Sequence, residues 1–411
     1  LGDLLMGFFS RLFGKPAPSA QRVVMTYDNA RTTDYNESHW AHADALSADK
    51  ANDPSVRKIL RNRANYEVAN NSYARGIVNT LAMDTVGTGP RLQIKTGDRE
   101  QDKEIETAFI DWSDEVSLAE KLEVAAKCQS TEGEAFLHLI ANPNLKSFAK
   151  FSLQEIPAFQ IASNYEDALD PKNVDGVILN DQDEEIAFVV QDPDYYLGKS
   201  ARVVSAENMI HLFEKFRAGQ HRGIPEITPC LDLFGQLRRY TKAVLYAVEA
   251  CANVSLVLQT KGVAPDEIAE VDALKAIKIQ PNMLTTLPEG WELEQTDPTQ
   301  PAATYPDFKR EILGEAARPF SMPLSVALGS SAGMNYASGR LDVKSYQRRL
   351  KVRRKQIEIK ALNKIVDLFL KFYFLSKGMP VPTDKIKRTY YWTEEEQVDP
   401  AKEANAAATL K

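Results

Sequence analysis

The chain of 411 residues is long enough for two or three domains, each with a sizeable core. Hydrophobic residues make up 44% of it and charged residues 26%. This is close to the average of globular proteins and excludes the collagen-like, low-complexity and disordered classes. The net charge of −7 argues against a protein that coats nucleic acid through a uniformly basic surface.

The cysteines and the apolar stretches exclude further classes. Cys128, Cys230 and Cys251 are odd in number and widely separated, so we expect neither a disulfide framework nor a Cys-x-x-Cys zinc or redox site, and we favour a reducing compartment. The longest apolar stretches, 243–258 and 366–375, are interrupted by charged and amide residues and are too short to span a bilayer. We predict no transmembrane helix.

Charge is distributed unevenly along the chain. The segment from Lys344 to Lys360 contains eight basic residues and one acidic residue, Glu358, which gives a local charge of +7. The remainder of the chain therefore carries −14. This separation predicts an acidic body with one concentrated basic feature, whose partner is either a polyanion or an acidic neighbour.

Residues 1–40 are interpreted as an N-terminal arm. Apolar residues at helical spacing predict a short amphipathic helix over 1–14 that ends at Gly14. Because few cations accompany this helix, we expect it to dock on the protein itself or on a partner subunit rather than on lipid.

The next part of the chain is expected to form a mixed α+β domain. Asp53-Pro54 predicts a helix start, and the helical pattern continues with breaks to Met83. A second helix is predicted over about 100–127. Short strands are then predicted at 136–140, 151–156, 176–179 and 186–190, because turn signals separate these apolar runs.

Two long helices flank a small insert in the second half of the chain. Thr228-Pro229 opens a helix of ~22 residues, or ~33 Å at 1.5 Å per residue. The insert is predicted to hold strands at 255–259 and within 279–294 and a helix at 265–277. Further helices are predicted at 306–317 and at 337–376, the latter closed by Gly378.

One motif resembles an enzyme site. Gly329-Ser330-Ser331-Ala332-Gly333 matches the Gly-x-Ser-x-Gly nucleophile elbow, and the segment 324–328 before it is compatible with a strand. In that fold the histidine follows the serine, yet all five histidines lie upstream of Ser331. We favour a flexible loop without chemistry and keep a hydrolase as an alternative.

Other candidate sites are weaker. The sequence Gly87-Thr88-Gly89-Pro90 lacks the length and the Lys-Ser/Thr ending of a phosphate-binding loop. The acidic run 181–185 is interpreted as a solvated turn, and Glu132 and Glu134 as structural carboxylates. No pair of histidines has metal-ligand spacing. We expect no catalytic residue, no metal and no cofactor.

The basic segment has two interpretations. Four of its residues, Lys344, Arg348, Lys351 and Lys355, fall on one helical ridge together with Arg340, which lies just before the segment. A polyanion that passes along the helix would meet several of these cations. The alternative is a solvated face, or a face paired with acidic neighbours, and both remain open. No signature of base-specific readout accompanies the charge.

Short motifs follow one another in a defined order over residues 53–376. They are Arg61-x-Arg63, Asn71-x-Tyr73-Ala74-Arg75-Gly76, Val86-Gly87-x-Gly89, Asp175-Gly176-Val177, 186–190, 205–213, Gly219-Gln220-His221-Arg222-Gly223-Ile224-Pro225 and Asn335-Tyr336-Ala337-Ser338-Gly339-Arg340. In this order they resemble the lambda-type portal proteins of tailed bacteriophages. The run 219–225 is the most specific match, whereas Ala337 and Gly339 depart from the family pattern.

This resemblance implies an α+β portal fold and a ring-forming subunit. Portal rings, usually of twelve subunits, occupy one capsid vertex and conduct DNA during packaging and ejection. By resemblance the chain divides into an arm at 1–40, a wing at 41–225, a stem helix at 226–250, an α/β clip at 251–300, a second stem helix at 301–320, a tunnel loop at 321–336, a long helix at 337–378 and the start of a crown or a tail at 379–411.

The resemblance also implies partners and a location. We expect other copies of the chain, double-stranded DNA, the terminase large subunit, the major capsid protein and head–tail connector proteins as partners, and no membrane. The protein is expected in the virion at the portal vertex, and in the host cytoplasm during assembly. We expect no enzymatic activity in this chain, because the motor that hydrolyses ATP is another protein.

Two sets of site residues follow. The residues predicted to contact DNA are Lys344, Arg348, Arg349, Lys351, Ser330, Ser331, Asn335 and Tyr336. The residues predicted to dock the motor or connector are Lys261, Asp266, Glu267, Glu270 and Asp272 in the clip. A serine hydrolase that uses Ser331 and a DNA-binding adaptor that forms no ring are the competing functions.

Overall fold

The computed structural model describes residues 30, 32–163, 170, 172–191, 201–252, 256–260, 291–295, 304–333, 336–382 and 385–392. The chain divides into two units, residues 1–47 and 48–411. In the first unit the described residues form one short helix, α2 (Glu37–Trp40). The helix predicted over 1–14 lies outside the described residues.

The second unit begins with three helices, α3 (Ala48–Ala51), α4 (Pro54–Asn70) and α5 (Ser72–Val86). The predicted start is confirmed, because the Asp53 carboxylate accepts the backbone N–H groups of the first turn of α4 at 2.7 and 3.0 Å. Asn71 is extended, so it ends α4 and caps α5 with its own side chain.

The single helix predicted over about 100–127 is wrong, because two helices occupy this stretch. They are α6 (Arg99–Glu115) and α7 (Leu118–Thr131). Ser117 between them has a φ of 53°, a left-handed conformation that a right-handed helix cannot continue through. The break allows Trp112 on α6 and Leu122 on α7 to be buried together in one core.

Two antiparallel sheets follow. The first has the order β3-β2-β8 and the second the order β4-β5-β6-β7. Their strands are β2 (Glu134–Ala141), β3 (Phe151–Ile156), β4 (Asn173–Val174), β5 (Val177–Leu179), β6 (Glu185–Val190), β7 (Arg202–Ser205) and β8 (Met209–Phe213), with a 3-10 turn at Ala158–Gln160. The four strands predicted here are confirmed, whereas β7 and β8 were not expected as strands.

A separate strand pair joins distant parts of the chain. β1 (Arg91–Lys95) pairs with β11 (Lys387–Tyr391), so that Leu92 lies opposite Tyr390. Neither strand was predicted, because each has few apolar residues and its partner lies about 300 residues away in the sequence.

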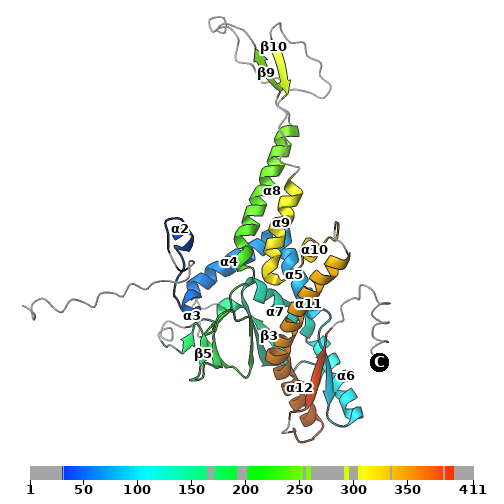
Figure 1. The fold of residues 1–411 in the computed structure, drawn as a ribbon. Helices are drawn as coiled ribbons and strands as arrows, with labels where there is room; N and C mark the ends of the chain where they lie inside the picture. The colour runs from blue at the N-terminus through cyan, green and yellow to red at the C-terminus, as the bar shows by residue number, and fades with distance from the viewer. Residues whose placement is uncertain are drawn as a thin grey trace, which may run out of the picture. The chain divides into compact units, whose positions relative to one another are not determined.

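The helix predicted to open at Thr228-Pro229 is confirmed, and the described part of the insert holds two paired strands. A 3-10 turn (Thr228–Cys230) leads into α8 (Leu231–Ala252), and α9 (Tyr305–Ala317) returns beside it (Figure 1). Between them β9 (Leu256–Thr260) pairs antiparallel with β10 (Trp291–Gln295). The helix predicted at 265–277 lies outside the described residues.

The last helices follow a 3-10 turn at Arg318–Phe320. The segment compatible with a strand is a helix instead, α10 (Leu324–Leu328). The long helix is confirmed as α11 (Tyr336–Ile357) and α12 (Asn363–Ser376), joined by a π-helical turn at Glu358–Leu362. This turn was not predicted, because nothing in the apolar spacing marks it.

Three hydrophobic cores hold the second unit together. The first surrounds Trp112, Phe151 and Phe369, with the Trp112 indole N–H donating to the Phe151 carbonyl at 3.1 Å. The second lies among α5, α8, α9, α10 and α11, and the third lies between the two sheets. Because α11 packs in the second core and α12 in the first, the long helix is fixed at both ends.

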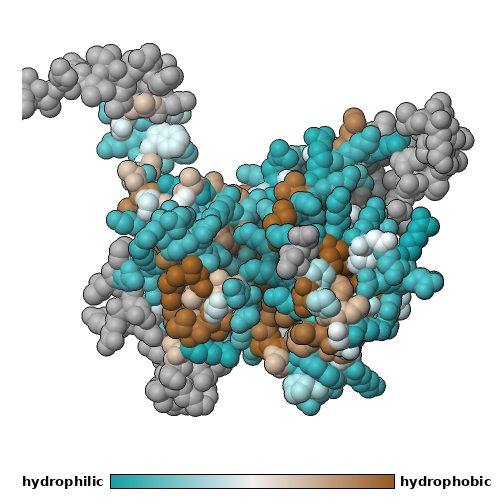
Figure 2. Space-filling view, turned by 90° about the horizontal axis from the view of Figure 1, so that it is seen from below, coloured by the Kyte–Doolittle hydropathy of each residue, from teal (hydrophilic) through white to brown (hydrophobic). Residues whose placement is uncertain are grey.

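The surface is mostly hydrophilic, with separate hydrophobic patches on the side seen in Figure 2. Small separate patches are ordinary for a folded protein. Among the helices of the described residues, none combines the length and the apolar composition needed to cross a membrane.

Candidate nucleic-acid interface

The basic residues of 344–360 divide into an exposed set and an engaged set, in which the side chains are bound by other parts of the fold. Lys344, Arg348, Lys351 and Lys355 are exposed, and their spacing of four, three and four residues puts them on one side of α11. We call these four residues the cationic ridge. It extends ~16 Å along the helix at 1.5 Å per residue.

Within the described part of the chain, the cationic ridge has little charge compensation. Lys355 pairs with Glu358 at 2.8 Å, one turn along the helix. Among the residues that the structure describes, Lys344, Arg348 and Lys351 have no hydrogen-bond or ion-pair partner. These three cations are therefore not paired with acidic neighbours among the described residues, and a solvated face and contact with a polyanion are the two interpretations that fit them.

The engaged set fastens α11 to the segment 214–226. Arg349 donates to Glu214 at 2.6 Å, and these hydrogen bonds raise the pKa of Arg349. Arg353 is buried, pairs with Glu226 and donates to Gln129 at 3.2 Å. The interpretation of paired acidic neighbours thus applies to Arg349 and Arg353.

A second set of contacts joins α11 to the end of α5. The Arg354 guanidinium donates to the carbonyl oxygens of Asp84 at 2.7 Å and Thr85 at 2.9 Å. A cation is favourable there, because the last carbonyls of a helix carry partial negative charge. The Tyr346 hydroxyl donates to the Asp84 carboxylate at 2.9 Å, while burial raises the pKa of Asp84. These bonds fix the direction in which the ridge points outward.

The Gly/Ser loop before α11 is exposed. Gly329 has a φ of 64° and ends α10, and the Ser330 N–H donates to the Ser325 carbonyl at 3.0 Å. Ser331 is also exposed. Asn335 lies outside the described residues, and Tyr336 begins α11.

The structure does not form a nucleophile elbow at Ser331. That motif needs a strand before the serine, whereas the segment 324–328 is helical. None of the histidines in the described residues is hydrogen-bonded to Ser331. The geometry therefore gives no support to the hydrolase.

The predicted docking residues of the clip are not placed. Lys261, Asp266, Glu267, Glu270 and Asp272 all lie in 261–290, outside the described residues. The strands on either side of them, β9 and β10, pair over five residues, with Leu256 opposite Gln295 and Thr260 opposite Trp291.

A buried ion cluster centres on Glu134 at the start of β2. Arg222 donates to both carboxylate oxygens of Glu134, at 2.7 to 3.1 Å, and Arg61 donates to one of them at 2.6 Å. The other oxygen lies 3.1 Å from His211 Nε2 and accepts the Gly223 N–H at 3.0 Å. Glu134 and Arg222 have no exposed surface.

The cluster extends to the β4–β5 turn. Arg222 lies 3.2 Å from the Asp175 carboxylate and donates to the Ile161 carbonyl at 3.1 Å. Arg57 on α4 also pairs with Asp175. Burial lowers the pKa of Arg57 to about 10, and the nearby Arg222 charge acts in the same direction.

Charge pairing determines the ionisation of Glu134. Burial alone would raise the pKa of this carboxyl, but the charges and hydrogen bonds of Arg222 and His211 outweigh burial and hold the pKa well below its usual range. Glu134 is therefore an anion inside the protein. Its role is structural, as the sequence predicted for this carboxylate.

Close backbone packing explains the second glycine of the run 219–225, Gly223. A Cβ on Gly223 would lie 2.1 Å from the Gly133 carbonyl oxygen and 2.8 Å from the Glu134 Cβ. The segment that contains Gly223 can pass this close to Glu134 only because the two residues in contact, Gly133 and Gly223, lack side chains.

Sequence reasoning used these motifs but missed that they meet. Arg61, Asp175, His211 and Arg222 come from four separate motifs, and the fold brings them together around Glu134. One signal was available in β8, where His211 interrupts an otherwise apolar run of five residues. A buried polar residue of this kind requires a partner.

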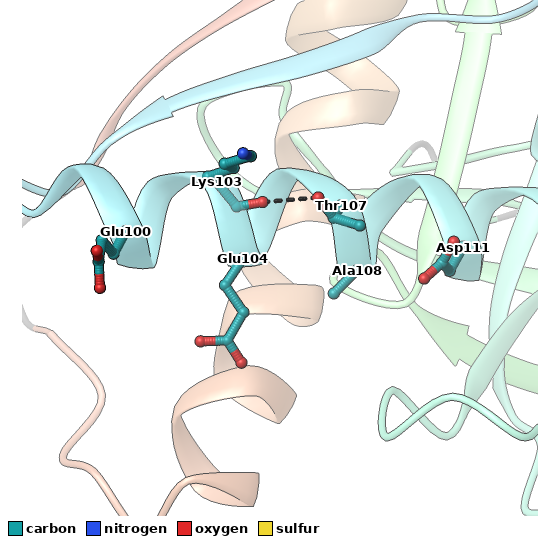
Figure 3. Close-up of a pocket in the computed structure, with 6 residues that line it drawn as sticks. All are labelled: Glu100, Lys103, Glu104, Thr107, Ala108 and Asp111. Atoms are coloured by element: carbon teal, nitrogen blue, oxygen red, sulfur yellow. Dashed lines mark hydrogen bonds between the residues drawn. The ribbon is translucent and has the colours of Figure 1, made fainter.

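A hollow of about 540 Å³ lies along α6. The six lining residues that Figure 3 labels all belong to this one helix. Glu100, Glu104 and Asp111 are its acidic members. Among the described residues, no group of three or more His, Cys, Asp or Glu side chains could hold a metal ion.

Solved structures with a similar chain trace include chains of gene transfer agent particles and a phage portal protein. A chain from the neck of a native gene transfer agent particle is 14% identical, with a TM-score of 0.49, and the match covers 87% of this chain and 89% of that one. An HK97-family phage portal protein from Corynebacterium diphtheriae is 11% identical, with a TM-score of 0.35, covering 72% and 90%. A comparison with curated proteins found no match.

The sequence itself matches a family model. The model of the lambda family of phage portal proteins aligns with residues 36–354, more than three quarters of the chain. The matched range includes the motif run 219–225, the ion cluster around Glu134 and nearly all of the cationic ridge. The chain belongs to the lambda family of phage portal proteins.

Proposed function

We propose that this portal protein assembles into a ring that conducts double-stranded DNA into and out of a tailed-phage capsid. A ring of twelve is the number that the family resemblance implies. In this proposal the protein belongs to the portal vertex of the virion, contacts the major capsid protein, and docks the terminase large subunit and later the connector proteins. The chain performs no catalysis.

The observation that carries the proposal is the cationic ridge, which an otherwise acidic protein presents on a firmly held helix. Lys344, Arg348 and Lys351 are exposed and uncompensated within the described residues, whereas Arg349, Arg353 and Arg354 hold the helix in place. A few cations on a rigid support suit brief contact with a passing phosphate backbone. A uniformly cationic channel would bind DNA through release of many counterions and retain it.

The residues that the sequence predicts to contact DNA form two groups in this proposal. Lys344, Arg348 and Lys351 are its main contacts. Ser330, Ser331, Asn335 and Tyr336 are a second group, because the exposed glycine-flanked loop lies directly before α11. Arg349 stays a predicted contact, although its guanidinium is engaged by Glu214. The clip residues 261–272 are proposed to dock the motor and connector.

Charge reversal of the ridge tests the DNA contact. The triple variant Lys344→Glu, Arg348→Glu and Lys351→Glu changes the chain charge by −6. A matched control with the same change uses three exposed residues away from the ridge, Lys95→Glu, Arg99→Glu and Lys103→Glu. The measurement is nuclease-protected DNA per particle, with ring assembly checked for both variants.

We expect the ridge variant to form rings and to package at least ~10-fold less DNA, because three phosphate contacts become repulsive. We expect the control to package normally. Normal packaging by the ridge variant would contradict the DNA contact. Loss of ring assembly in the ridge variant alone would also contradict it, by assigning the ridge to a contact between subunits. Salt-sensitive DNA binding by a stable monomer would support the adaptor instead.

A further inference from the structure

Helices α8 and α9 form an antiparallel pair with a defined register. At one end the Cys230 thiol lies 3.0 Å from the Ala316 carbonyl, and towards the other end the Thr241 and Tyr305 hydroxyls lie 3.1 Å apart. The rings of Tyr240 and Phe308 also contact, with centroids 4.6 Å apart. These contacts use one side of each helix.

The middle of the opposite side of α8 is cationic and partly apolar, and the exposed Asp232 and Glu249 lie towards its two ends. Arg239, Lys242 and Tyr246 are exposed, and their spacing of three and four residues puts them on one ridge, turned away from the buried Phe234 and Leu237. The Tyr246 side chain is 67% exposed. Within the described residues neither Arg239 nor Lys242 has an ion-pair partner.

The outward side of α9 has the opposite charge. Asp307, Glu311 and Glu315 are exposed at intervals of four residues, and Phe308 beside them is 42% exposed. The part of the chain that the structure describes provides no cation bound to any of these three carboxylates. The helix pair therefore has one cationic and one anionic outer side, each with an exposed aromatic ring.

Arg239 and Asp307, one on each charged side, lie at matching heights. Arg239 is nine residues beyond Cys230 along α8, and Asp307 is nine residues before Ala316 along α9. Because Cys230 and Ala316 are level, both charges lie ~13.5 Å from that level at 1.5 Å per residue. In a ring whose axis runs along the helix pair, rotation involves no shift along that axis, so groups at one height in a subunit meet groups at the same height in its neighbour.

We propose that the α8 side of one copy docks on the α9 side of the next copy, with Arg239 facing Asp307 and with Lys242 and Glu311 on either side of this pair along the axis. The contact is head-to-tail, because each copy contributes a different side, and a head-to-tail contact closes into a ring when the rotation between copies divides a full turn. Tyr246 and Phe308 supply apolar area beside the charges. This inference rests on the proposed ring and names the surfaces that form it.

Two charge-reversed proteins test this contact. The first is Arg239→Glu with Lys242→Glu, and the second is Asp307→Lys with Glu311→Lys. All four positions are exposed, so each protein should fold, which circular dichroism and thermal unfolding verify. The control is Lys58→Glu with Arg63→Glu, which changes two exposed cations on α4. The measurement is native mass by light scattering, together with images of the particles.

We expect each reversed protein alone to lose the ring and give the 45.9 kDa chain, and the control to assemble normally. An equimolar mixture of the two reversed proteins should form rings again, because opposite charges meet at every contact of an alternating ring. The acidic α8 side of the first protein meets the basic α9 side of the second, and the unaltered basic α8 side of the second meets the unaltered acidic α9 side of the first. Such rings contain an even number of alternating copies. The rescue excludes misfolding as the reason why the separate proteins fail.

The outcomes separate this inference from the proposed function. Normal rings from either reversed protein, or a mixture that stays monomeric, would overturn the α8–α9 contact while leaving the ring intact. Failure of the unaltered protein to form any ring would instead overturn the proposed function. Rescue by the mixture is the result that only a head-to-tail charge match predicts.

Discussion

Arg222 and Glu134 form a two-point ion pair in which neither side chain has exposed surface. The Arg222 Nε and Nη2 atoms donate to the carboxylate at 2.7 to 3.1 Å, and Arg61 and His211 complete its surroundings. The pair joins β2 to the segment that leads into α8. The motif that most specifically resembles the portal family is therefore an internal fastening, and its central ion pair is closed to solvent.

Removal of the Glu134 charge should destabilise the protein strongly. In the Glu134→Gln variant the Arg222 guanidinium stays buried without its anion, and breaking a buried pair costs about 3–5 kcal/mol. The measurement is the free energy of unfolding in denaturant. Glu184→Gln, at an exposed position, serves as the control and should change it by less than about 0.5 kcal/mol. Equal effects of the two substitutions would contradict the role of the cluster.

Stability should fall in acid because of the same carboxyl. The pKa of Glu134 is well below normal in the folded protein, and the pKa of Glu185 is also lowered, because His211 outweighs the effect of burial. The unfolded chain binds protons near the ordinary glutamate pKa of about 4.3, so it binds more protons than the folded state below that pH. This contribution is complete above about pH 5 and is lost as the pH falls.

The measurement is the free energy of unfolding between pH 7 and pH 3. We expect a steeper decline for the unaltered protein than for Glu134→Gln, which lacks the titrating group. Parallel curves for the two proteins would show that the Glu134 carboxyl has the same pKa in the folded and the unfolded protein, which would contradict its lowered pKa in the fold.

The same substitution should have opposite effects at two glycines. Gly223→Ala places a methyl group 2.1 Å from the Gly133 carbonyl oxygen, which should destabilise the protein by at least about 1–3 kcal/mol. Gly235→Ala, within α8 and with open space around it, should stabilise the protein by up to about 1 kcal/mol. Thermal unfolding of both variants measures the difference. A tolerated Gly223→Ala would mean that the two segments do not cross so closely.

DNA affinity should depend on salt through the cationic ridge. Replacement of Lys344, Arg348 or Lys351 by Gln should lower the slope of log K against log salt by about 0.9 for each phosphate that the variant no longer neutralises. Lys371→Gln, an exposed cation on α12, is the control and should leave the slope unchanged. Binding of a short duplex at several salt concentrations gives the slope. An unchanged slope in all three ridge variants would count against the ridge as the DNA-binding surface.

Elements with local signals were predictable from the sequence. Asp53-Pro54 gave the start of α4, and the spacing of apolar residues gave α8, α9 and the long helix. The break at Ser117 was missed, because a left-handed serine depends on how Trp112 and Leu122 pack and has no local signature. The β1–β11 pair was missed for a similar reason, since its hydrogen bonds join residues far apart in the chain.

The candidate site was predictable in part. Helical spacing alone placed Lys344, Arg348, Lys351 and Lys355 on one ridge, and the structure shows them exposed. The sequence could not separate Arg349 from this set, because only the fold brings Glu214 to it. Burial of charge depends on tertiary partners, which spacing along one helix does not reveal.

Assembly of the purified, unaltered protein tests the central claim most directly. The measurement is native mass by light scattering with electron-microscope images of the same peak. The account predicts closed rings with a central opening and a mass near 550 kDa for twelve copies of the 45.9 kDa chain. A protein that stays monomeric or dimeric at every concentration, without rings in the images, would contradict it.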